Sequence, residues 1–171
     1  MFKKLIAATI AATATVLPVS AEVQPGTQSL LQTISANGIK VTINHEDCLT
    51  NGQNGSYRWL GFQREMRLCP GNTVDAVDHA TVRHETIHAI QHCVNAARGT
   101  HVDTPIITDE SSFYSFVNEN LSPREQRWVM NMYDESQHLT ELEAFAGARA
   151  YTSAELEEMF LDVCTVVEPT E

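Results

Sequence analysis

Two histidines and a glutamate near the middle of the chain have the residue types and the spacing of a metal site. His84 and His88 are four residues apart, so on a helix their imidazoles lie one turn apart on nearly the same side and can bind one ion. Glu85 lies roughly 100° round that helix, beside the ligand face, where its carboxylate can reach a water molecule next to the ion. The pattern therefore predicts metal-assisted activation of water, with Glu85 as the proton acceptor.

A third ligand is needed, because catalytic sites of this kind usually combine three protein ligands with one open position. His92 continues the four-residue spacing, but on a helix it is about 12 Å from His84, so one ion cannot bind the whole series. His101 follows a glycine and could fold back toward the site. Glu141 and Glu143 lie in a later helical stretch, roughly 200° apart around its axis, so only one of them can face the ion.

In these two segments the sequence resembles the gluzincin zinc metallopeptidases, in which a His-Glu-x-x-His helix is joined by a glutamate from a later helix. The resemblance implies a zincin-like fold, one Zn²⁺ ion and a peptide or protein substrate. The ligand glutamate of such families often opens a Glu-x-x-Ala pattern, and matching this pattern selects Glu141, with Glu143 as the alternative. Phe145 stands where an acidic or amide residue would follow, so the pattern does not identify the group that orients a histidine ligand.

The resemblance also implies a role for each residue. Zinc held by His84, His88 and Glu141 would lower the pKa of a bound water and polarise the scissile carbonyl. Glu85 would accept the proton of that water and pass it to the leaving amine. The donor that stabilises the oxyanion could come from one of three later side chains: Tyr133, His138 and Tyr151.

Two other interpretations stay open. The chain could be a zincin-like module that binds zinc or a partner without hydrolysis. The presence of Glu85 argues against such a module, since a structural zinc site is more often closed by a fourth protein ligand. The chain could also be a structural protein that is stabilised by disulfide bonds and holds no metal.

The paired histidines require a helix, and the sequence predicts one around them. Asn72 or Thr73 can cap its start, and it should run to Arg98 and end at Gly99. Apolar residues cover much of its circumference, so we expect it to be buried at the centre of the fold.

Strands are predicted before this helix and further helices after it. The segments 39–43 and 57–68 have strand-like spacing and should form an antiparallel hairpin. The other predicted helices are 27–36, 111–118, one that begins at the capping box of Ser122, 138–151, and one from the capping box of Thr152 to 166. The predicted fold class is α+β, with a small antiparallel sheet packed against a mainly helical body.

The first residues have the form of a secretory signal peptide. Lys3 and Lys4 precede an uncharged run at 5–17 and a cleavage pattern that ends at Ala21. The apolar run is too short to span a bilayer comfortably. We therefore expect cleavage after Ala21, leaving one domain, 22–171, that is secreted or periplasmic and makes no membrane contact.

Charge and cysteine content restrict the partners and the compartment. The chain has 11 basic and 22 acidic residues, a net charge of −11, and loss of Lys3 and Lys4 would leave nine basic residues and −13. Such acidity argues against nucleic acid as a partner. The four cysteines lie in the exported part, which predicts two disulfides, and of three possible connectivities we expect Cys48–Cys69 and Cys93–Cys164. We expect a monomer.

Overall fold

The computed structural model describes residues 25–43, 54–61, 63–69, 79–100 and 104–165. In chain order its elements are α1 (Pro25–Ala36), β1 (Ile39–Ile43), β2 (Gly55–Leu60), β3 (Gln63–Leu68), α2 (His79–Ala97), α3 (Glu110–Asn120), α4 (Pro123–Met132), a 3₁₀ turn (Glu135–Gln137), α5 (His138–Ala150) and α6 (Ser153–Cys164). The predicted α+β class is confirmed, with a small sheet and a mainly helical body.

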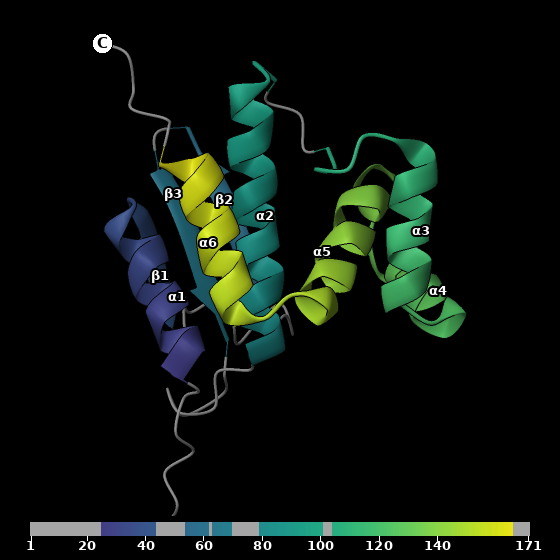
Figure 1. Cartoon of the computed structure of the whole chain (residues 1–171), viewed down its shortest axis with the longest axis horizontal. Helices are drawn as coiled ribbons and strands as arrows, with labels where there is room; N and C mark the ends of the chain where they lie inside the picture. Colours follow the sequence, from purple (N-terminus) through teal and green to yellow (C-terminus); the bar gives the residue numbers. More distant parts are fainter. Residues whose placement is uncertain (1–24, 44–53, 62, 70–78, 101–103, 166–171) are drawn as a thin grey trace, which may run out of the picture.

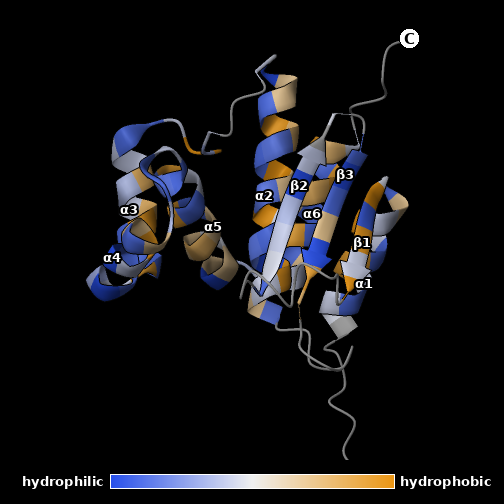
Figure 2. Ribbon diagram, turned by 180° about the vertical axis from the view of Figure 1, so that it is seen from behind, coloured by the Kyte–Doolittle hydropathy of each residue, from blue (hydrophilic) through white to orange (hydrophobic). Residues whose placement is uncertain are grey.

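The helices form two groups, one that covers the sheet and one that lies apart from it. Helices α1, α2 and α6 lie along one face of the sheet, whereas α3, α4 and α5 lie beyond α2, away from the strands (Figure 1). Viewed from behind, the strands lie in front of α6 and α1 (Figure 2). Helix α2 is therefore central, as its apolar circumference predicts. Among the residues described, none of the helices is long and apolar enough to cross a membrane.

The sheet is mixed, so the prediction of a purely antiparallel sheet was wrong. Strand β3 lies between the other two, antiparallel to β2 and parallel to β1. The predicted strand 57–68 is in fact two strands, because Gly61 adopts a φ of 67° in a tight turn between β2 and β3. The hairpin is therefore formed by β2 and β3, and β1 pairs in parallel with the other edge of β3.

Two hydrophobic clusters hold the elements together, and α5 contributes to both. The larger is packed around α2 and includes Leu30, Ile34, Ile39, Met66, Leu68, Ile87, Ile90, Ala144, Leu156 and Phe160. The smaller fills the space between α3, α4 and α5 with Phe113, Val117, Val129, Leu142 and Ala146. Burial of each large side chain contributes about 1.5–3 kcal/mol. Helix α5 therefore packs against both clusters and is held beside α2.

Local signals at the helix ends are confirmed. Ser122 and Thr152 each form a capping box, with Glu125 and Glu155 respectively. Gly99, which has a φ of 73°, follows the end of α2.

The predicted bond between Cys93 of α2 and Cys164 of α6 is present, with a Cα–Cα distance of 5.2 Å. Other predictions fall on residues outside the described part of the chain: the signal peptide at 1–21, Cys48 of the pair Cys48–Cys69, the caps Asn72 and Thr73, and His101.

Candidate metal centre

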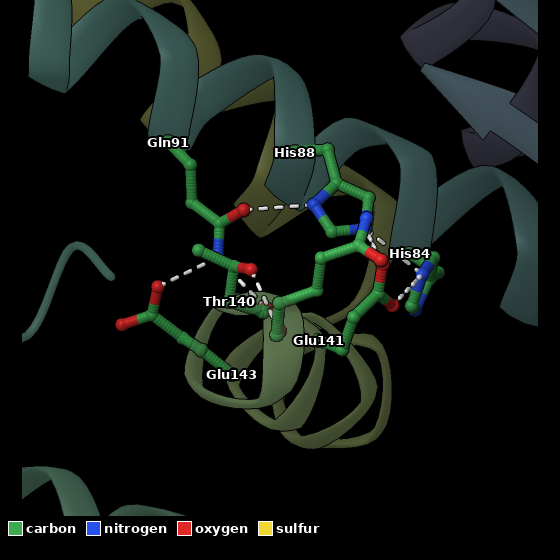
Figure 3. A network of polar contacts seen from close by, with 7 residues as sticks. His84, His88, Gln91, Thr140, Glu141 and Glu143 are labelled. Atoms are coloured by element: carbon green, nitrogen blue, oxygen red, sulfur yellow. Dashed lines mark hydrogen bonds and ion pairs between the residues drawn. The ribbon is translucent and has the colours of Figure 1, made fainter. Parts of the chain in front are cut away.

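The site lies where α2 and α5 approach each other closely. A side chain on Gly147 of α5 would have its Cβ 2.8 Å from Cδ1 of Ile87, so only glycine fits without a shift. The approach brings the first turn of α5, which carries Glu141, opposite His84 and His88 of α2 (Figure 3). A carboxylate in a first turn also interacts favourably with the helix dipole.

The ligand atoms of these three side chains converge. Nε2 of His84 lies 3.1 Å from Nε2 of His88 and 3.3 Å from Oε2 of Glu141. The other carboxylate oxygen, Oε1, is 3.5 Å from Nε2 of His88. Ligands that bind one tetrahedral ion at about 2.0–2.1 Å lie about 3.3 Å from one another. The group could therefore hold a metal ion.

One atom of the group supports this fit directly. Oε2 of Glu141 is buried, and although it lies 3.3 Å from Nε2 of His84, it makes no well-formed hydrogen bond within the residues described. A buried carboxylate oxygen without a hydrogen bond costs free energy, so such an atom calls for an explanation. A bound cation would satisfy it, and two imidazoles with one carboxylate are donors that divalent transition metals accept.

The three side chains shift one another's pKa values. Burial would raise the pKa of Glu141, but its close polar contacts with His84 and His88 lower it to about 2. Burial would likewise lower the pKa of His88, but Glu141 raises it to about 9. Burial dominates at His84 and lowers its pKa. A metal ion that binds Nε2 of His88 would therefore have to compete with a proton.

Glu85 lies beside the group, against the sheet. It is only 4% exposed, and a Cβ on Gly55 of β2 would lie 2.8 Å from its Oε1, so a larger residue at position 55 would displace the carboxylate. Burial raises the pKa of Glu85 to about 7, although His88 and the backbone N–H of Tyr57 oppose the shift. A carboxylate with this pKa can both accept and release a proton near neutral pH.

Glu143, the alternative ligand, does not join the group. Its carboxylate accepts hydrogen bonds from Nε2 of Gln91 at 2.9 Å, from the backbone N–H of Ile106 at 2.7 Å and from that of Ile107 at 2.8 Å. Gln91 in turn accepts from Nδ1 of His88 at 2.8 Å (Figure 3). The sequence reasoning missed Gln91, although its position three residues after His88 places it one turn away on the same helix.

Phe145 packs against the first ligand. Its ring centroid is 4.3 Å from that of His84, and Trp128 of α4 meets it edge-on at 5.4 Å. Where the gluzincin pattern has an acidic or amide residue, this chain therefore places an aromatic ring on a ligand histidine.

The remaining candidates are His92 as a ligand and three side chains as the oxyanion donor. His92 packs against Trp59, with ring centroids 4.9 Å apart, and is not part of the group. Nε2 of His138 lies 3.0 Å from the carbonyl oxygen of Tyr133, and Tyr151 stacks on Phe116. Of the three oxyanion-donor candidates, Tyr133 is the one affected by the site, since burial and the charges of Glu141 and Glu85 raise its pKa.

Comparison with known proteins does not assign this site to a family. No family model, curated protein or solved structure matches the chain.

Proposed function

We propose that the protein is a zinc-dependent hydrolase that cleaves peptide bonds, acting in the periplasm or outside the cell. The observation that carries the proposal is the convergence of His84, His88 and Glu141 from two helices, with Glu85 buried beside them. The resemblance to gluzincins and the form of residues 1–21 support it. The disulfide between Cys93 and Cys164 is consistent with an oxidising compartment.

Zinc suits the donor set best. Two histidines and a carboxylate form the three-ligand set of many catalytic zinc sites, which leaves a fourth direction for water or substrate. Bound Zn²⁺ supplies a Lewis acid that polarises a carbonyl and lowers the pKa of a coordinated water.

Two residues beside the ligands then have separate roles, one in proton transfer and one in hydrogen bonding to the oxyanion. Glu85 accepts a proton from the attacking water and returns it to the leaving amine, for which a pKa of about 7 is well placed. Tyr133 keeps its proton, because its pKa is raised, and can donate a hydrogen bond to the developing oxyanion.

One observation favours a second candidate, a zinc-binding module without turnover. His84 and Glu141 are only 8% and 7% exposed, so access for a large substrate is narrow. In such a module zinc would bind and stabilise the fold, but no peptide would be cleaved.

A single variant tests the proposed function. Glu85→Gln keeps the size of the side chain and removes the base, so we expect cleavage of a peptide library to fall on the order of 10²–10⁴-fold. Metal analysis should still find one zinc per chain. Glu158→Gln, an exposed position on α6, is the matched control and should keep full activity.

The outcomes separate the candidates. Full activity of Glu85→Gln would remove the assigned base. Zinc bound by the wild-type chain with no cleavage of any peptide would instead support the module.

A further inference from the structure

We propose that Gln91 is a positioning residue for the metal: it holds His88 with Nδ1 protonated, so that Nε2 is the atom left to bind the ion. The inference rests on the metal site of the proposed function. It assigns a role to a buried amide that the reaction chemistry does not use.

The orientation of the Gln91 amide follows from its neighbours. Its Nε2 lies 3.0 Å from the carbonyl oxygen of Thr140 and 2.9 Å from Oε2 of Glu143. A backbone carbonyl can only accept, so the NH₂ group must face Thr140 and cannot exchange places with the oxygen. Its two hydrogens thereby match two acceptors, both from α5.

The fixed amide determines the tautomer of His88. With the NH₂ group turned to α5, Oε1 of Gln91 faces Nδ1 of His88 at 2.8 Å. An amide oxygen only accepts, so Nδ1 must carry a hydrogen. In the neutral ring Nε2 is then unprotonated, and it points toward His84 and Glu141 (Figure 3).

The other histidine ligand is held differently. Nδ1 of His84 is buried and has no hydrogen-bond partner within the described part of the chain. Its ring rests on Phe145 instead. The orientation of one ligand therefore depends on packing, whereas that of the other depends on a hydrogen bond, and this makes Gln91 the more specific target.

The same contacts link His88 to the segment that joins α2 and α3. Glu143, which accepts from Gln91, also accepts from the backbone of Ile106 and Ile107. Asn95, one turn after Gln91 and also buried, holds this segment through Thr104, with bonds of 2.9 and 2.6 Å. Asn95 thus shares the structural surroundings of Gln91 but makes no contact with His88, and it supplies a matched control.

Zinc affinity, measured on the full chain by competition with a chelator, tests the inference. Gln91→Met keeps the length of the side chain and removes the amide acceptor, so we expect affinity to fall about 10- to 100-fold, as for other residues that orient metal ligands. Gln91→Glu keeps an acceptor for Nδ1 but places a carboxylate oxygen against Glu143 and the carbonyl oxygen of Thr140, so it should lower the free energy of unfolding while zinc affinity stays within about tenfold of the wild type. Nitrogen-15 NMR of the zinc-loaded wild type should show a slowly exchanging Nδ1 proton on His88, and in Gln91→Met the same proton, without its acceptor, should exchange faster.

The control separates positioning from general stability. Asn95→Leu is nearly isosteric and removes buried hydrogen bonds of the same helix, so it should lower the free energy of unfolding but keep zinc affinity. Wild-type affinity in Gln91→Met, or an equal loss in Asn95→Leu, would overturn the inference. A wild-type chain that takes up no zinc would overturn the proposed function itself. Comparison of Gln91→Met with Asn95→Leu decides the inference even where Gln91→Glu does not fold.

Discussion

At the scale of single residues, two glutamates two positions apart on one helix have different surroundings. Glu141 faces two imidazoles and has a buried oxygen without a well-formed hydrogen bond in the described residues, whereas Glu143 accepts three N–H hydrogen bonds. The difference lies in what faces each carboxylate, since both side chains are buried. A carboxylate oxygen that lacks a hydrogen bond, as in Glu141, is suited to bind a cation, whereas a carboxylate that already accepts three hydrogen bonds, as in Glu143, is suited to hold neighbouring segments together.

This contrast gives a paired prediction. Glu141→Gln removes a charged ligand, and we expect zinc affinity to fall more than about 100-fold. Glu143→Gln can place its amide oxygen toward Gln91 and its nitrogen toward Ile107, so it should lose stability but keep affinity within about tenfold. Chelator competition on both variants measures the difference. The reverse order of effects would show that the ligand had been assigned to the wrong glutamate.

At the scale of elements, the sheet carries a polar ladder on the face that points away from the core. Glu65 of β3 accepts hydrogen bonds from Thr42 of β1 and Arg67 of its own strand, both at 2.8 Å, and pairs with Lys40 at 3.2 Å. The next residue, Met66, points the opposite way into the core. The ladder thus joins β1 to β3 from outside while apolar side chains join them from within.

The ladder should make stability depend on acid pH. Burial would raise the pKa of Glu65, but hydrogen bonds from Thr42, Arg67 and Lys40 lower it from 4.5 to about 2. Because the folded pKa is below the unfolded one, this contribution is fully present above pH 4.5 and is lost as the pH falls toward 2.

Urea unfolding at about pH 6 and about pH 3 measures this contribution. The wild type should lose more stability between these conditions than Glu65→Gln, which has no charge to lose. Equal losses in the two proteins would contradict the assignment of this pKa to the ladder.

The elements also show where prediction from sequence succeeds. Helices that begin at Ser122 and Thr152 were predictable because a capping box is made within four residues. Strand pairing was not, since the alternating pattern of 39–43 suits a parallel or an antiparallel neighbour equally, and the informative residue was Gly61, whose turn divides the predicted strand.

The site shows the same division. His84, Glu85 and His88 follow from spacing on one helix. The choice between Glu141 and Glu143 depends on how α5 faces α2, and the geometry there requires glycine at 147. The spacing within α2 places Gln91 one turn from His88, but its role depends also on acceptors from α5, which that spacing does not reveal.

At the scale of the whole molecule, α2 is linked to a different helix on each of two sides. The bond between Cys93 and Cys164 joins α2 to α6 across 71 residues of sequence. On a chain-entropy estimate a loop of this length stabilises the fold by about 4 kcal/mol. His84, His88 and Glu141, which could hold a metal ion, bring α2 and α5 together on the side of α2 away from α6. A bound ion would therefore secure the helix pair that the disulfide leaves unconnected.

Metal removal should therefore lower the thermal stability of the chain even with the disulfide intact. At a free zinc concentration 100 times the Kd, binding adds about 2.7 kcal/mol to the free energy of unfolding. For a protein of this size that corresponds to roughly 5–10 °C in Tm. Calorimetry with and without a chelator measures the shift, and the variant His84→Ala with His88→Ala should show none. An unchanged Tm in the wild type would favour a disulfide-stabilised protein that holds no metal, because an ion bound to the folded state alone must raise the Tm by mass action.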